Sequence, residues 1–273
     1  MLSCALSKTV ATLALLGACA GAAAHDTWFL PLGAPSGVPL LSLGTGNRYP
    51  LQEFPIGAEQ LTMRGCRSAD DRPVSFSAVR DLPKSLLLQA AVAGAPRDRL
   101  AAPLSCWAQL VPFEVELEAR IVDIYLDEIA ASPAVREAWA GMRARGVTWK
   151  ERFTKHARIE LAAGRSTAAA AASGMGLDAL LQSGLQRLRE GDPLEVQVLR
   201  DGQPLAGLAV ELIDARGASG GWFHTDAQGR VGFGAPAPGR WVLRGTDLRV
   251  STTEPDTWDS RFINLAFEVN AKP

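Results

Sequence analysis

The residues best suited to chemistry follow an alanine run, in the stretch Ala22-Ala23-Ala24-His25-Asp26-Thr27-Trp28. If a leader is removed after Ala24, the mature chain begins with His25 and carries a free amine beside its imidazole. These two groups titrate near ~7.7 and ~6.5, so both are available as donors close to neutral pH. Nickel and copper favour such nitrogen donors. His25 is therefore predicted to ligate a transition metal, with Asp26 adding an oxygen; the alternative is that His25 only marks a cleavage site.

An imidazole site can draw on few other residues, because the chain contains only three histidines: His25, His156 and His224. His224 is expected on a strand, with Trp222 on the same face and Phe223 on the opposite one. His156 is expected on a helix face that it shares with Trp149. Packing against aromatic neighbours is the simpler interpretation of both, so their roles as metal ligands are secondary hypotheses.

Motifs for other chemistry are missing. Gly44-Thr45-Gly46 lacks the helix and the lysine of a phosphate-binding loop. The acidic pair Asp123 and Asp127 is more simply the solvated end of a helix or strand than a pair of glycosidase carboxylates. The net charge of −1 gives no electrostatic reason to expect nucleic acid as a partner. A binding protein without enzymatic activity is therefore expected.

Residues 1–24 have the pattern of a secretory signal peptide. Lys8 supplies the positive charge, Thr9 to Leu16 form a short apolar segment, and the alanines before His25 form a cleavage site. That apolar segment is too short for a membrane span, and no later segment is long enough. We expect a periplasmic protein with no transmembrane span after signal removal. The alternative is a lipoprotein anchored at Cys19, since Leu16-Gly17-Ala18-Cys19 fits a lipidation site.

The export prediction also determines how the cysteines are interpreted. Cys66 and Cys106 are the two that remain beyond the leader. An even pair in an oxidising compartment predicts a disulfide. Metal ligation by the pair is the weaker alternative, because there is no Cys-x-x-Cys spacing.

Short apolar runs bounded by glycine and proline predict a mainly β protein. We expect two immunoglobulin-like β-sandwich domains with a short helical segment between them. The predicted boundaries are residues 25–126 for the N-terminal sandwich, 127–190 for a helical segment, a strand and an alanine-rich connector, and 191–273 for the C-terminal domain. In the last of these, Asp201-Gly202 is a hairpin turn signal.

The middle segment carries two helix signals. Ser132 and Pro133 suit the N-cap and first position of a helix that ends at Gly146. The sequence Thr148-Trp149-Lys150-Glu151 has the spacing of a capping box and predicts a second, short helix. A strand is expected from Ala157 to Leu161, followed by the connector at residues 162–176.

Several motifs, spread from residue 25 to residue 269, resemble a large bacterial family of exported proteins of unknown function. That family is grouped with periplasmic components of nickel and cobalt uptake. The similar segments are His25-Asp26-Thr27-Trp28, Gly44 to Pro50, Glu151 to Arg158, Thr225 to Arg230, Trp241, and Trp258-Asp259-Ser260. The chain departs from the family at Met175 to Leu180, which replaces a proline-containing run, and at His156, which replaces a tyrosine.

The resemblance implies a two-part, mostly β exported protein with a link to divalent metals. Our first hypothesis is a periplasmic binding protein for nickel or cobalt, with copper as another candidate metal, that serves an inner-membrane metal transporter. The second is a structural, carbohydrate-binding or protein-interaction module that uses Trp222, Trp241 and Trp258. The third is a copper-dependent oxidative enzyme in which His25 and a second histidine hold the metal.

Overall fold

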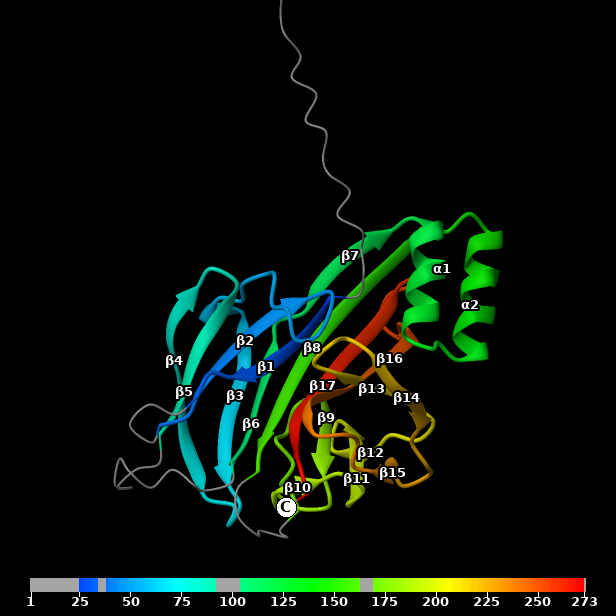
Figure 1. The fold of residues 1–273 in the computed structure, drawn as a ribbon. Helices are drawn as coiled ribbons and strands as arrows, with labels where there is room; N and C mark the ends of the chain where they lie inside the picture. The colour runs from blue at the N-terminus through cyan, green and yellow to red at the C-terminus, as the bar shows by residue number, and fades with distance from the viewer. Residues whose placement is uncertain (1–24, 34–37, 92–103, 163–168, 273) are drawn as a thin grey trace, which may run out of the picture.

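The computed structural model describes residues 25–33, 38–91, 104–162 and 169–272. The predicted signal peptide, its alternative lipidation site at Cys19 and residues 163–168 of the predicted connector lie outside this part. The protein is mainly β, with two short helices, as the sequence predicts (Figure 1).

The N-terminal strands are β1 (Asp26–Pro31), β2 (Leu40–Gly46), β3 (Leu61–Ser68), β4 (Pro73–Leu82), β5 (Ser85–Ala91), β6 (Leu104–Leu110) and β7 (Phe113–Leu117). Two helices follow, α1 (Ala119–Glu128) and α2 (Pro133–Ala144). The later strands are β8 (Trp149–Leu161), β9 (Leu177–Leu181), β10 (Leu188–Arg189), β11 (Pro193–Arg200), β12 (Gln203–Pro204), β13 (Ala209–Asp214), β14 (Ser219–His224), β15 (Arg230–Gly234), β16 (Gly239–Val250) and β17 (Trp258–Asn270).

The long parallel strands β8 and β17 connect the N-terminal and C-terminal strands of the large sheet. The main path of the large sheet runs β1-β2-β5-β4-β3-β6-β8-β17-β16-β13-β14. Because β8 pairs with β6 on one side and with β17 on the other, strands from both halves of the chain share one sheet. The mainly β class is confirmed, but the strands form this one curled mixed sheet and a small second sheet, in place of two separate immunoglobulin-like sandwiches.

The segment from Trp149 is a strand, so the predicted short helix there is wrong. The spacing of Thr148 and Glu151 imitates a capping box, but the Glu151 carboxylate has other partners. It accepts hydrogen bonds from the Tyr125 hydroxyl at 2.9 Å, the Trp149 indole at 2.9 Å and the Ser260 hydroxyl. Ladders with β7 and β17 use the backbone groups that a helix would have used.

The sheet curls so that β1 returns to lie against β8 and β17 (Figure 1). Phe29, Leu43, Leu86 and Ile159 fill the interior of the curl. The predicted disulfide between Cys66 and Cys106 is present and joins directly opposed residues of β3 and β6.

The other face of β17, β16 and β13 is covered by the small sheet β12-β11-β15, to which β9 adds a strand. Leu177, Val196 and Val198 of the small sheet pack against Leu243 and Leu265 of the large one. The two helices lie together at one end of the long strands (Figure 1). α2 begins as predicted, with the Ser132 hydroxyl accepting from the Val135 amide at 3.4 Å. No helix in the described ranges has the length and apolar character that crossing a membrane requires.

Candidate functional site

His25 directly precedes β1 and is partly buried. Its ring lies against the ring of Phe54, with 4.5 Å between the centroids. Burial lowers the pKa of the imidazole, Lys155 lowers it further, and the carboxylates of Glu53 and Asp26 oppose the shift. His25 is therefore a neutral nitrogen donor at pH 7, held against the protein.

Asp26, the other predicted ligand at the start of β1, has buried and well-paired carboxylate oxygens. Its Oδ2 accepts from Arg244 Nη1 at 3.1 Å, and its Oδ1 accepts from Asn264 Nδ2 at 3.2 Å. Arg244 also donates from Nε to Glu211 Oε2 at 2.9 Å. Residues from β1, β13, β16 and β17 thus form one buried polar cluster, and metal ligation by Asp26 would have to compete with Arg244 for its carboxylate.

His156 lies in the middle of β8 and is fully buried. Its Nδ1 is 2.9 Å from the carbonyl oxygen of Phe262, so Nδ1 carries the proton and donates it. Its Nε2 has no hydrogen-bond partner within the described residues and lies beside Gly176 and Arg261. Burial lowers the pKa of His156 to about 4, so its imidazole is neutral in the folded protein near pH 7.

This shift predicts a pH dependence of stability. In the unfolded chain, His156 binds a proton with a pKa of about 6.5. In the folded protein its pKa is about 4, so it stays neutral over the pH range between these two values. The stability that the neutral ring contributes is thus complete above pH 6.5 and is lost as the pH falls toward 4, by about 3 kcal/mol. His156→Gln should flatten the dependence by this amount in urea unfolding at pH 7, 6, 5 and 4.5. His224→Gln, at an exposed histidine, is the control, and an unchanged slope in His156→Gln would refute the prediction.

His224 ends β14 and is exposed. The predicted alternation is confirmed, because Phe223 packs into the core between the sheets while Trp222 is 39% exposed. The expected surface of three tryptophans is not formed: Trp241 is 8% exposed, and Trp258 is fully buried in a stack with Trp149. Trp241 and Trp258 instead pack in the hydrophobic core, and Trp222 is the exposed one of the three.

The structure does not bring the three histidines together. Successive residues of a strand face opposite ways, so His156 lies on the face of β8 opposite to Lys155, whose charge acts on His25. β14, which carries His224, is four positions from β8 in the sheet, or roughly 19 Å. Across the described ranges, no group of three or more His, Cys, Asp or Glu side chains is arranged to hold a metal ion.

Lys155 and the cluster around Asp26 are features that the sequence did not reveal. Burial lowers the pKa of Lys155 to about 8, with Asp26 opposing the shift. On a strand, Lys155 shares a face with Trp149 and Phe153. A lysine on the same strand face as two large aromatic residues would have indicated a buried amine. Because a helix was predicted from Thr148, this two-residue periodicity was not recognised.

The comparisons with known proteins give a match to a family model over part of the chain and no activity. No curated protein sequence matches the chain. Among solved structures, native alpha-2-macroglobulin from Escherichia coli, spanning domains MG0-NIE-MG1, is similar at 11% identity over 86% of this chain and 95% of that one. Its TM-score of 0.20 is too low to carry an argument about fold. Residues 142–246, from the end of α2 into β16, match the family model described as a domain of unknown function, DUF4198.

Proposed function

We propose that the protein is an exported binding protein for a divalent transition metal, nickel or cobalt, that assists uptake across a membrane. His25 supplies the anchoring ligands, its amine and its imidazole, once residues 1–24 have been removed. The observation that carries the proposal is the position of His25. It directly precedes a strand whose register is fixed from the pair Asp26 and Gly46 onward, and its ring lies against Phe54.

This position bears on the main alternative, that His25 only marks a cleavage site and frays in solvent. A fraying terminus would lose conformational entropy on binding a metal, whereas a terminus held by β1 has already lost it. The lowered pKa of the imidazole also means that no proton has to leave the ring before a metal binds at neutral pH.

An oxygen ligand would come more easily from Glu53 than from Asp26. Both oxygens of Asp26 are engaged by Arg244 and Asn264. Glu53 is exposed and uses Oε2 to accept from the Asn47 amide at 2.8 Å. Its other oxygen has no hydrogen bond in the part of the chain that the structure describes. The hypothesis of a copper-dependent enzyme needs a second histidine near His25, and the positions of His156 and His224 do not support it.

The test is a titration of chain that begins at His25, with the start verified by intact mass. Isothermal titration with nickel or cobalt chloride should give a Kd of micromolar or lower. A single glycine added before His25 removes the chelate and should raise the Kd at least 100-fold, and His25→Gln should do the same. His224→Gln is the matched control and should leave the Kd unchanged. Equal titration of the extended and native proteins would refute the anchor.

The same mass measurement distinguishes the two predicted N-termini of the mature chain, His25 and Cys19. Protein isolated from the periplasmic fraction with a mass beginning at His25 agrees with the proposal. A lipid-modified mass beginning at Cys19 would place the amine elsewhere and refute the chelate.

A further inference from the structure

Lys155 on β8 carries a primary amine whose surroundings the fold alone does not explain. Its side chain is buried, with 9% of the residue exposed. Within the described ranges, Nζ makes no hydrogen bond and no ion pair, and Asp26 is the one opposite charge that acts on it. Asp26 does not bond to it, because the two oxygens of Asp26 accept from Arg244 and Asn264. A largely buried lysine is uncommon unless it is paired, so this amine calls for a partner.

The course of β1 determines which part of β8 the start of the mature chain approaches. β1 lies against β8 and runs in the same direction (Figure 1). At the start of β1, Asp26 is bonded to Asn264, which is paired with Ala157 of β8. At the end of β1, Pro31 lines a cavity together with Ile159 of β8. The residue before β1 is therefore directed toward the part of β8 that precedes Ala157.

Lys155 lies in that part of β8. It is two residues before Ala157, about 7 Å along the strand, and its side chain is on the same face. Its Nζ is 5.5 Å from the centre of the Phe153 ring, so the side chain leans toward the start of β8, on the side of His25. The charge of Lys155 lowers the pKa of the His25 imidazole. The Lys155 amine and the His25 ring therefore lie in one region.

We propose that Nζ of Lys155 is a third nitrogen ligand of the metal that His25 anchors, a proposal that rests on the function proposed above. No group of three or more His, Cys, Asp or Glu side chains in the described ranges is arranged to hold a metal, so a third ligand has to be of another kind. An amine, an imidazole and a second amine form an all-nitrogen set, which suits nickel and copper.

The protonation state of Lys155 gives the proposal a clear alternative. As an ammonium group, Lys155 would repel a divalent cation bound at His25. As a neutral amine it offers a lone pair, and its proton goes to solvent when the metal binds. Burial away from water favours the neutral form, in agreement with the lowered pKa of Lys155. Lys155 therefore either ligates the metal or opposes its binding, and the two roles change the affinity in opposite directions.

The first test is isothermal titration of nickel chloride into chain that begins at His25. Lys155→Met keeps the length of the side chain and removes the amine. It should raise the Kd about 10-fold or more, since even a residue that only orients a ligand contributes about 10–100-fold. Lys150→Met is the matched control and should leave the Kd unchanged, because Lys150 is exposed on the same strand in an ion pair with Glu116. An equal Kd in Lys155→Met overturns the proposal, and a lower Kd overturns it by showing that Lys155 repels the metal.

The second test distinguishes a ligand from a residue that only supports the fold. With copper chloride, the visible absorption band of the complex should lie at longer wavelength in Lys155→Met than in the native protein, because an oxygen of water replaces a nitrogen donor. A supporting residue would change the Kd and leave the band in place, which would overturn the proposal. If circular dichroism shows that Lys155→Met does not fold, Lys155→Gln takes its place in both tests.

The native chain separates this proposal from the one on which it rests. If it binds neither metal, the proposed function fails, and the role of Lys155 fails with it. If it binds, and a glycine before His25 abolishes binding while Lys155→Met keeps the native Kd and band, His25 remains the anchor and only Lys155 is excluded.

Discussion

Replacing Arg158 by methionine is expected to lower the free energy of unfolding by about 3–5 kcal/mol. Arg158 is fully buried on β8, and its guanidinium joins three elements. Nε donates to Glu160 at 2.7 Å, Nη1 donates to both oxygens of Asp178 at 3.0 and 3.1 Å, and Nη2 donates to the Ser105 hydroxyl and the Ala171 carbonyl. Methionine fills the space but leaves two carboxyl groups buried without their cation.

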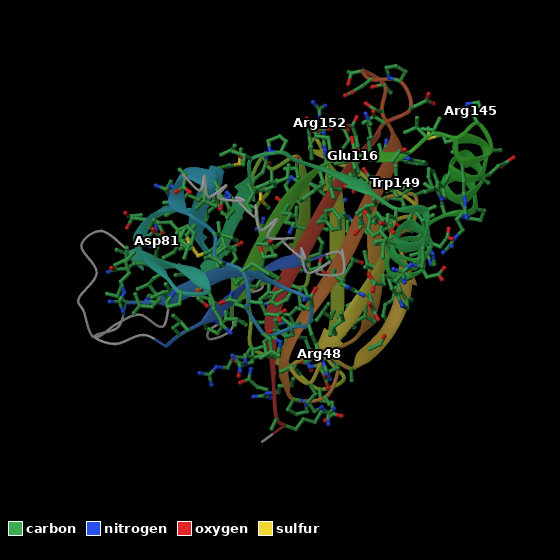
Figure 2. The ribbon with its side chains drawn as sticks, turned by 90° about the horizontal axis from the view of Figure 1, so that it is seen from above. Arg48, Asp81, Glu116, Arg145, Trp149 and Arg152 are labelled. Atoms are coloured by element: carbon green, nitrogen blue, oxygen red, sulfur yellow. A yellow bond between two sulfur atoms is a disulfide. The ribbon has the colours of Figure 1, made fainter. Side chains whose placement is uncertain are left out.

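Arg152 provides the matched control for this variant. It lies on the same strand and is labelled in Figure 2. The side chains of its ion pair with Asp259, at 3.3 Å, are partly exposed. Arg152→Met should therefore cost less than about 1 kcal/mol. Adding Glu160→Gln and Asp178→Asn to Arg158→Met removes the unpaired charges and should recover most of the loss. Urea unfolding measures all three proteins, and equal losses in the two single variants would contradict the account.

Removing the disulfide is expected to cost about 3–4 kcal/mol. Cys66 and Cys106 are 40 residues apart in the sequence, and a cross-link over such a loop restricts the unfolded chain by roughly this amount. The double variant Cys66→Ala/Cys106→Ala should show the loss in urea unfolding under oxidising conditions. Refolded in dithiothreitol, the native protein should come within about 1 kcal/mol of the variant, since only packing then differs. A reduced native protein as stable as the oxidised one would contradict the prediction.

Local signals in the sequence predicted local structure well. The Asp201-Gly202 turn joins β11 to β12, and both residues have the positive φ, +50° and +77°, that a tight hairpin requires. Ser132 caps α2, and the alternation of Trp222 and Phe223 across β14 is as expected. Each of these depends on neighbours within a few residues, and such patterns are visible without the fold.

The polar clusters could not be predicted in the same way. Asp26 meets Arg244 and Asn264 across 218 and 238 residues, and no periodicity connects them. Arg158 and Glu160 look like an ordinary charged strand until β9 brings Asp178 beside them. The error at Trp149 has a similar origin, because a capping-box spacing describes four residues and carries no information about the strands on either side.

The contacts of β1 also determine when this part of the structure can fold during synthesis, which proceeds from the N-terminus. The strand after His25 is among the first to emerge, yet the partners of Asp26 lie on strands near the other end of the sequence. Contacts between distant residues slow folding because a long loop must close before they form. Asp26 therefore stays without Arg244 and Asn264 until nearly the whole chain has been delivered, and a truncation that removes β17 should leave β1 paired with β2 but the polar cluster around Asp26 incomplete.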